Sequence, residues 1–80
     1  MEQSVVAIVQ DVVNGKHGTY VVTTSKEVEG SITFSLGKEV WREDKHPEEG
    51  DRVVLLRVYQ KRGGWRALEA RFFGLKDGQH

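Results

Sequence analysis

The segment from Pro47 to Phe73 constrains the fold of this chain more than any other. An acidic turn occupies residues 47–51, and two stretches of alternating apolar and polar residues follow at 52–60 and 65–73. Alternation with a period of two is typical of β-strands with one buried face, and the basic, glycine-containing stretch 61–64 between them is a turn sequence. The segment therefore predicts a β-hairpin with one apolar face and one face of Arg, Lys, Tyr and Trp.

Two sets of apolar residues predict which side of this hairpin is buried. The first set is Val54, Leu56 and Val58, and the second is Leu68, Ala70 and Phe72. All six residues have even numbers, so both sets face the core only if the numbers of two residues that lie opposite each other add up to an even number. Val58 opposite Leu68 is such a pair. The loop then consists of residues 62–64, in which glycine supplies a left-handed bulge position. A two-residue turn at Gly63-Gly64 would mix the two faces and is rejected.

The same register predicts which polar side chains meet across the hairpin. Arg57 lies opposite Glu69, which predicts a cross-strand ion pair worth about 0.2–1 kcal/mol. Lys61 lies opposite Trp65, a pair suited to a cation–π contact. Part of the outward charge is therefore expected to be used within the hairpin itself.

The rest of the chain adds three strands and no amphipathic helix. Runs rich in β-branched residues predict strands at 4–13, 19–24 and 28–36, with a hairpin turn at 14–18 that begins with Asn-Gly. The stretch 37–46 is expected to hold either a short strand or one helical turn around its Trp. Five strands joined by short turns predict an all-β protein, either a barrel or a small sandwich.

Three smaller features add to this pattern. Ile32, Phe34 and Leu36 share one face of their strand, and the other face carries hydroxyl groups. Trp41 is expected to lie in the core or to cap the open end of a barrel, whereas the alternation does not assign Tyr20 to either face. An aspartate in the acidic turn at 47–51 is expected to bond the backbone of that turn, with a chelated cation as the weaker alternative.

Length and composition limit the class of protein. Eighty residues correspond to one domain, expected at 1–73 and followed by a short polar tail at 74–80. The chain has no cysteine, which removes disulfides and thiolate metal sites and fits a reducing compartment. It has no apolar run approaching the roughly 20 residues of a membrane span and no basic signal-peptide start. We expect a cytoplasmic monomer with no cofactor, no bound metal and no membrane contact.

Charge is balanced overall but not along the chain. Lys and Arg number 12 and Asp and Glu number 12, yet residues 1–51 carry a balance of −5 and residues 52–80 a balance of +5. A neutral whole argues against strong non-specific binding to duplex nucleic acid, where summed phosphate contacts dominate. The basic second part still allows a local anionic partner. The alternative is that the two parts neutralise each other across the fold.

The second half of the chain resembles a known class of small barrels. The run Glu49-Gly50-Asp51-Arg52-Val53, followed by a glycine-rich turn and Gly64-Trp65-Arg66-Ala67-Leu68-Glu69-Ala70, is similar to the closing half of cold-shock domains and of the related S1-type RNA-binding domains. The resemblance covers residues 5–73 and is firmest at 48–73. It implies a five-stranded closed barrel like that of oligonucleotide/oligosaccharide-binding (OB) folds, with an SH3-like barrel as the alternative. It also implies binding of single-stranded nucleic acid, RNA before DNA.

The first half departs from the cold-shock pattern where that family binds its ligand. The second-strand motif falls at 17–22, where Gly18 and Tyr20 fit an S1 domain better than a run of phenylalanines. The third-strand motif falls at 32–36, where Thr33 and Ser35 stand in place of the family's outward aromatic and histidine. Stacking on aromatics is worth about 1–3 kcal/mol per base. The resemblance therefore implies only modest affinity.

Basic residues interleaved with aromatic residues suit a single strand, because cations follow its backbone and ring faces receive its bases. On that basis the candidate nucleic-acid-binding residues are Lys16, His17, Tyr20, Arg57, Tyr59, Lys61, Arg62, Trp65, Arg66 and Arg71. The alternative function is a protein-interaction or adaptor barrel that has lost its nucleic-acid face. It is favoured by the missing aromatics of the third strand, the zero net charge and the acidic first half.

Catalysis is not expected. The chain has no Ser-His-Asp order, no phosphate-cradling glycine loop and no pair of carboxylates with an apolar setting. Its three histidines, His17, His46 and His80, have no metal-ligand spacing. The sequence therefore predicts a binding module and not an enzyme.

Overall fold

Five β-strands make up most of the protein. In the computed structural model, which describes residues 4–74, they are β1 (Ser4–Gly15), β2 (Gly18–Thr24), β3 (Ser31–Ser35), β4 (Arg52–Lys61) and β5 (Gly64–Phe72). Residues 4–74 contain no helix. The prediction of an all-β protein is confirmed. The expected C-terminal tail, apart from Gly74, lies outside the described residues.

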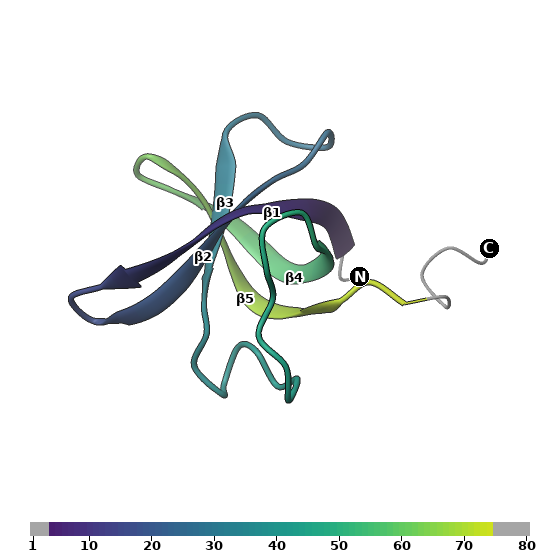
Figure 1. Ribbon diagram of the computed structural model, residues 1–80. Helices are drawn as coiled ribbons and strands as arrows, with labels where there is room; N and C mark the ends of the chain where they lie inside the picture. Colours follow the sequence, from purple (N-terminus) through teal and green to yellow (C-terminus); the bar gives the residue numbers. More distant parts are fainter. Residues whose placement is uncertain (1–3, 75–80) are drawn as a thin grey trace.

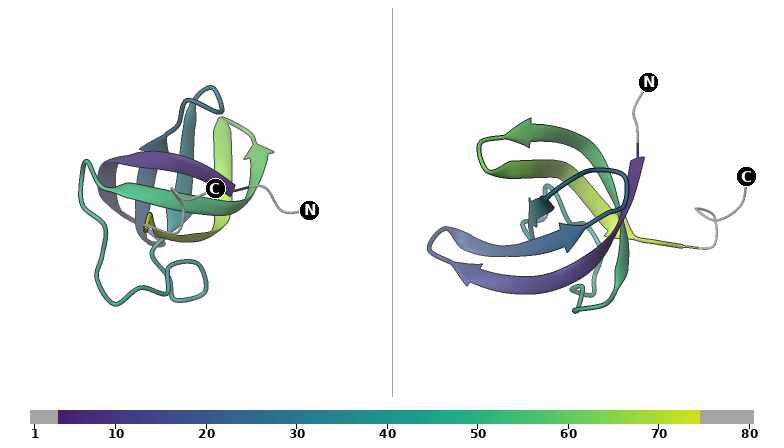
Figure 2. Two further views of the ribbon diagram at one scale, coloured as in Figure 1. Left: turned by 90° about the vertical axis from the view of Figure 1, so that its right-hand side faces the viewer. Right: turned by 90° about the horizontal axis from the view of Figure 1, so that it is seen from above.

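The strands close into a barrel in the order β1-β2-β3-β5-β4 (Figures 1 and 2). All neighbours are antiparallel except β3 and β5, which are parallel and meet at only two residue pairs. The long strand β1 pairs with both β2 and β4 and thereby joins the two edges of the sheet. The expected closed, five-stranded OB-like barrel is confirmed. The β1–β2 and β4–β5 hairpins project from the same side of it (Figure 2).

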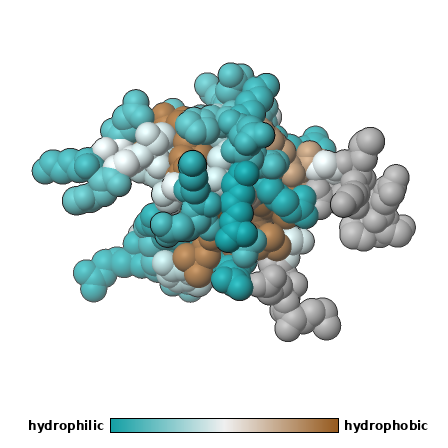
Figure 3. All heavy atoms as spheres, turned by 90° about the horizontal axis from the view of Figure 1, so that it is seen from below, coloured by the Kyte–Doolittle hydropathy of each residue, from teal (hydrophilic) through white to brown (hydrophobic). Residues whose placement is uncertain are grey.

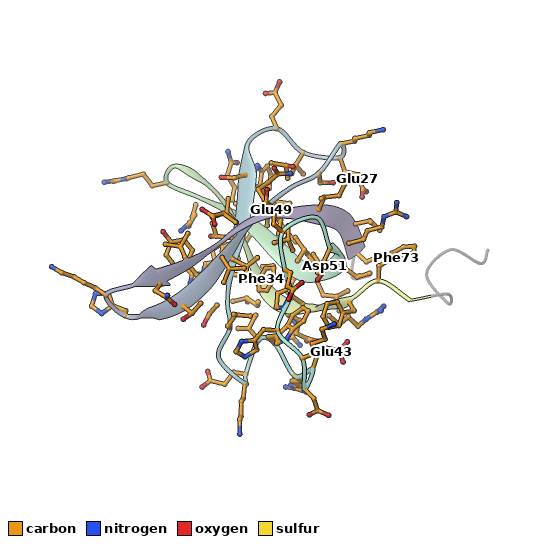
Figure 4. All side chains as sticks on the ribbon, in the orientation of Figure 1. Glu27, Phe34, Glu43, Glu49, Asp51 and Phe73 are labelled. Carbon is orange, nitrogen blue, oxygen red and sulfur yellow. The ribbon has the colours of Figure 1, made fainter. Side chains whose placement is uncertain are left out.

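The core fills the barrel around Phe34, which is completely buried (Figure 4). The indole of Trp41 stacks on Phe34 with ring centroids 5.7 Å apart and meets the edge of Phe72 at 4.8 Å. Its N–H donates to the carbonyl oxygen of Lys45 at 2.9 Å, so burial leaves no unpaired polar atom on the ring. The prediction that Trp41 lies in the core or caps the barrel is confirmed, and the buried face of β3 is confirmed by Ile32 and Phe34.

The segment around Trp41 closes the barrel where β3 is too short to follow β5. The amide of Trp41 donates to the carbonyl of Gly37 at 2.8 Å, which makes one hydrogen-bonded turn, and Trp41 itself forms an isolated parallel bridge with Ala70. The segment therefore contains a part of both predicted alternatives. The amide of Ala70 on β5 then donates to the carbonyl of Val40 at 3.0 Å. A carboxylate oxygen of Glu43 accepts from the amide of Phe72 at 3.2 Å (Figure 4). Loop atoms thus complete the ladder that a longer β3 would supply.

The predicted register of the β4–β5 hairpin is wrong. Lys61 pairs with Gly64 and Val58 pairs with Ala67, so the sum of paired numbers is odd and the turn has two residues, Arg62 and Gly63. Gly63 takes a φ of 88°, which L side chains rarely adopt. Neither the predicted three-residue turn nor the rejected Gly63-Gly64 turn occurs.

The predicted buried faces of this hairpin are also partly wrong. Val53 and Leu55 are fully buried on β4, where Leu56 is only partly buried. On β5, Ala67 is buried and Leu68 is 45% exposed, although Ala70 is buried as predicted. A prediction from alternation requires that the inward residues are either all odd-numbered or all even-numbered along a strand. In this hairpin the inward residues change from odd to even numbers, or the reverse, within each strand.

The parity changes at Arg57, whose φ is 54°, a left-handed conformation in a residue other than glycine. On one side of it Leu55 faces the core, and on the other side Val58 packs against the core. The side chain of Arg57 still reaches Glu69, with Nε 3.7 Å from Oε1. The predicted ion pair is therefore confirmed, although the direct cross-strand partner of Glu69 is Leu56.

Two turns complete the comparison with the sequence. The β1–β2 turn consists of Lys16 and His17, with Gly15 opposite Gly18, so it lies at the centre of the predicted turn 14–18, and Asn14 and Gly15 belong to β1. In the acidic turn, Oδ2 of Asp51 accepts from the amide of Glu48 at 2.8 Å, which confirms the predicted backbone bond.

Candidate nucleic-acid interface

A hollow of about 400 Å³ lies between the tips of the two projecting hairpins; we call it the hairpin hollow. The β1–β2 hairpin contributes Gly15, Lys16, His17, Gly18, Thr19 and Tyr20. The other lining residues are Thr33, Ser35, Lys61 and Arg66. β3 lies between the hairpins in the sheet, because Thr33 pairs with Val22 of β2 on one side and with Arg66 of β5 on the other. The tips that project on this side of the molecule are hydrophilic (Figure 3).

The charge of the hairpin hollow has a single sign. Lys16, Lys61 and Arg66 line it, and none of the described lining residues is Asp or Glu. Two other hollows of this surface have mixed charge. One, of about 540 Å³, includes Glu27 beside Lys26 and Arg52, and another, of about 170 Å³, includes Glu43 and Glu69 beside two arginines. The hairpin hollow is therefore a local cationic site on a protein whose net charge is zero.

Hydroxyl groups line the part of the hairpin hollow that belongs to β2 and β3. The hydroxyl of Ser35 accepts from the amide of Gly37 at 3.0 Å, which leaves its own proton available for donation. The hydroxyl of Thr19 donates to Oδ1 of Asn14 at 2.9 Å, which leaves its oxygen able to accept. The site therefore offers both donors and acceptors where cold-shock domains carry stacking side chains.

Tyr20 is the aromatic residue of the hairpin hollow. It is partly buried and pairs with Val13 on one side and Ser35 on the other. Its ring lies against the backbone of Gly15, where an added Cβ would stand 3.1 Å from Cε1 of the ring. The glycine of the Asn-Gly pair thus accommodates the tyrosine ring instead of forming the turn.

The structure brings half of the ten sequence-predicted binding residues together. The five that line the hairpin hollow are Lys16, His17, Tyr20, Lys61 and Arg66. Tyr59 does not line the hollow; it is the cross-strand partner of Arg66, which does, and it is 44% exposed. Arg62 occupies the β4–β5 turn, and Arg57 contacts Glu69. Arg71 lines the smaller hollow of mixed charge.

The prediction that Trp65 lies on the outward face is wrong. Trp65 pairs with the fully buried Ile32 and packs against the core, and its indole N–H donates to the carbonyl of Glu29 at 2.9 Å. Gln60, and not Lys61, is its cross-strand partner. The cause is the change of parity at Arg57, because of which Ala67 and Trp65 face inward on β5 although Ala70 does so as well. Trp65 is partly buried and is not among the residues that line the hairpin hollow.

Sequence reasoning did not select the three hydroxyl residues Thr19, Thr33 and Ser35 as binding residues, although they line the hairpin hollow. The alternation of β3 carried the necessary signal for Thr33 and Ser35, because it placed their hydroxyls opposite the buried Ile32 and Phe34. They were passed over because they are not aromatic. Thr19 had no comparable signal, because its place depends on the true position of the β1–β2 turn.

Residues 4–74 were compared with two other kinds of functional feature, a metal site and a membrane-spanning helix. No group of three or more His, Cys, Asp or Glu side chains in that range is placed to hold a metal ion. The same residues include no helix of the length and apolarity required to cross a membrane.

Comparison with known proteins identifies no relative. A scan against protein-family models found no match, and searches of curated proteins and of solved structures found none either. The fold and the residues of the hairpin hollow are therefore the grounds for assigning a function.

Proposed function

We propose that this protein binds a short stretch of single-stranded nucleic acid, RNA before DNA, in the hairpin hollow. One observation carries the proposal. Lys16, Lys61 and Arg66 converge on one hollow that no described Asp or Glu lines, in a chain with equal numbers of acidic and basic residues. A groove of one positive sign attracts a phosphate backbone, and cations beside an aromatic ring are the combination by which proteins bind single strands.

The polar lining gives the ligand further contacts. The arginine and lysines donate to phosphate oxygens, and the hydroxyl proton of Ser35 adds a neutral donor. One base stacks on Tyr20, and a second reaches the exposed ring of Tyr59, the cross-strand partner of Arg66. The protein makes fewer stacking contacts than a cold-shock domain, so its affinity is modest.

Binding is expected to weaken with salt by an amount that the number of cations sets. Three neutralised phosphates correspond to a slope of about −2 in log K against log salt for a single strand, or roughly a twentyfold loss between about 50 and 200 mM salt. Fluorescence anisotropy of a labelled oligo-U of about ten nucleotides, titrated at several salt concentrations, measures this slope. A slope near zero would exclude phosphate contacts as the source of affinity.

The residues responsible are tested with two charge-matched triple variants. Replacing Lys16, Lys61 and Arg66 by Gln is expected to reduce oligo-U affinity more than tenfold, because the hollow then holds no fixed positive charge. Replacing Lys38, Arg42 and Lys45 by Gln changes the net charge by the same amount outside the hollow and is expected to change affinity less than twofold. Anisotropy at low salt measures both, and oligo-dT of the same length gives the preference for RNA.

Two outcomes would contradict the proposal. One is an absence of binding to both oligonucleotides at low salt, and the other is an equal loss in the two triple variants, which would indicate only non-specific charge. Either outcome would favour the adaptor barrel. In that case a pull-down after nuclease treatment is expected to recover the same protein partner with the wild type and with the triple variant of Lys16, Lys61 and Arg66.

A further inference from the structure

The upstream half of β1 has a free edge. β1 pairs with β4 from Ser4 to Ile8, but it pairs with β2 only from Ile8 to Gly15, because β2 ends at Thr24. Among residues 4–74, the main chain from Ser4 to Ala7 therefore has no neighbouring strand on its β2 side. In an antiparallel ladder the hydrogen-bonding groups of alternate residues point to the same edge, so Ser4 and Val6 direct theirs toward this gap.

Two side chains stand where the missing strand would be. The amide of Val6 donates to Oε2 of Glu27 at 3.1 Å, and the carbonyl of Val6 accepts from the hydroxyl of Ser25 at 2.8 Å. Glu27 projects from the β2–β3 loop toward the beginning of β1 (Figure 4). In both contacts a side chain bonds the main-chain group of Val6 that a neighbouring strand would bond in a β-ladder. These two side chains hinder non-specific pairing of another chain with the edge. They also show that the amide and carbonyl of Val6 can form hydrogen bonds in this direction.

A second hollow lies beside this edge; we call it the β1 hollow. It has a volume of about 540 Å³, and its apolar residues are Val6 and Ile8, the latter 45% exposed. Lys26 and Arg52 line it as well. The carboxylate of Glu27 also lines it and is bonded to the Val6 amide. An occupant that takes the place of Glu27 would meet an apolar surface flanked by two cations.

The Glu27 cap on the Val6 amide can be exchanged without opening the barrel. The loop that carries Glu27 is held elsewhere, by Val28 packed against the core and by the indole N–H of Trp65 donating to the carbonyl of Glu29. The side chain of Glu27 itself is exposed. Its rotation away from Val6 therefore breaks one surface hydrogen bond and leaves the core contacts of the loop in place.

We propose that the upstream edge of β1 is a docking site for an extended peptide segment of another protein, which adds as a strand along Ser4 and Val6. The peptide's backbone replaces Glu27 at the amide of Val6. An apolar side chain of the peptide lies on Val6 and Ile8, and an acidic side chain two residues away on the same face lies between Lys26 and Arg52. This site is separate from the hairpin hollow and shares no residue with it.

The test uses a displayed library of random ten-residue peptides, selected against the full chain. The expected result is enrichment of peptides that alternate apolar residues and carry at least one Asp or Glu. Glu27→Ala is expected to bind an enriched peptide roughly two- to tenfold more tightly, because a competing hydrogen bond is removed. Glu29→Ala, in the same loop, is the matched control and is expected to bind as the wild type does.

Two further variants test the surface and the backbone separately. Ile8→Lys places a charge on the apolar part of the β1 hollow and is expected to weaken peptide binding more than tenfold. Ser4→Pro removes one edge donor at the first residue of β1, where proline is tolerated, and is expected to weaken it severalfold. Both variants should keep wild-type affinity for oligo-U, and this separates the present proposal from the proposed function. An unchanged two-dimensional amide NMR spectrum away from β1 verifies their fold.

The docking site would be overturned by any of three results. These are no enriched peptide, enriched peptides that Ile8→Lys binds as tightly as the wild type, or enriched peptides that oligo-U displaces. The last result would show that the peptide binds in the hairpin hollow and not at the edge of β1.

Discussion

At the residue scale, Arg57 shows how one backbone conformation changes a whole face. Its φ of 54° lies in the left-handed region, which costs L residues other than Asn and Asp roughly 1–2 kcal/mol. Its ion pair with Glu69 offsets little of this conformational cost, because the two side chains are 58% and 37% exposed and exposed pairs are worth about 0–1 kcal/mol. The conformation is maintained by the barrel, which needs the change of parity between Leu55 and Val58 to keep apolar residues inside.

This account predicts an unusual order of stability at position 57. Arg57→Gly and Arg57→Ala both remove the ion pair, but only glycine adopts a positive φ without steric cost. Arg57→Gly is therefore expected to be more stable than Arg57→Ala by about 1 kcal/mol, after the larger chain entropy of glycine in the unfolded state is included. Urea denaturation of the two variants measures the difference. Equal stability, or a more stable alanine variant, would contradict a strained Arg57.

At the scale of the element, the β4–β5 hairpin has its register decided by the turn and by the barrel and not by its apolar pattern. Arg62 and Gly63 form the turn, and the pairing from there places Ala67 inside and Leu68 outside. A leucine exposed to 45% and an alanine exposed to 1% reverse the ranking that hydrophobicity alone suggests. Alanine fits the interior there because the barrel is narrow and β3 and β4 lie close on either side.

The reversed ranking has a direct mutational consequence. Leu68→Ala is expected to lower the free energy of unfolding by less than about 1 kcal/mol, well below the roughly 2–5 kcal/mol of a buried leucine. Ala67→Leu is expected to cost about 1–3 kcal/mol, because the added atoms have no space in the core. Chemical denaturation compares the two. The register first predicted from the alternation requires the opposite result.

At the scale of the whole molecule, the barrel depends on contacts between distant parts of the chain. β1 completes the barrel only when it pairs with β4, so Val6 pairs with Val54, which lies 48 residues further along the chain. The hairpin hollow has the same character, because it joins Lys16 of the acidic first part to Lys61 and Arg66 of the basic second part. Its single positive sign is a property of the closed barrel and not of either hairpin alone.

Such a topology predicts slow folding for a chain of this size. The entropy of closing long loops is lost before the distant strand pairs form, so refolding is expected in milliseconds to seconds and not in microseconds. Stopped-flow refolding from urea, followed by the fluorescence of the buried Trp41 and the partly buried Trp65, measures the rate. Complete refolding within the dead time of mixing would show that local contacts dominate.

The fold follows from the sequence to a large extent, because strand periodicity and turn residues are local signals. They placed the five strands within a few residues and the inward face of β3, and they indicated the burial of Trp41. The Arg57–Glu69 contact was also predicted correctly, because long side chains reach each other even when the register differs by one residue. Of the candidate binding residues, Lys16, His17 and Lys61 come together in the hairpin hollow for a local reason, since they lie at or next to turns that had to be exposed.

Tertiary structure alone decided what depends on the parity of a strand or on the closure of the barrel. No pattern marked the left-handed Arg57, so Trp65 was predicted outside and lies against the core. Nothing local showed that β2 ends before β1 does, which leaves Ser25 and Glu27 to bond the backbone of Val6. The sequence by itself determined which residues form strands and turns. The barrel determined which of their side chains meet, because each strand of a closed sheet pairs with a neighbour on both sides, and these two pairings together fix its register.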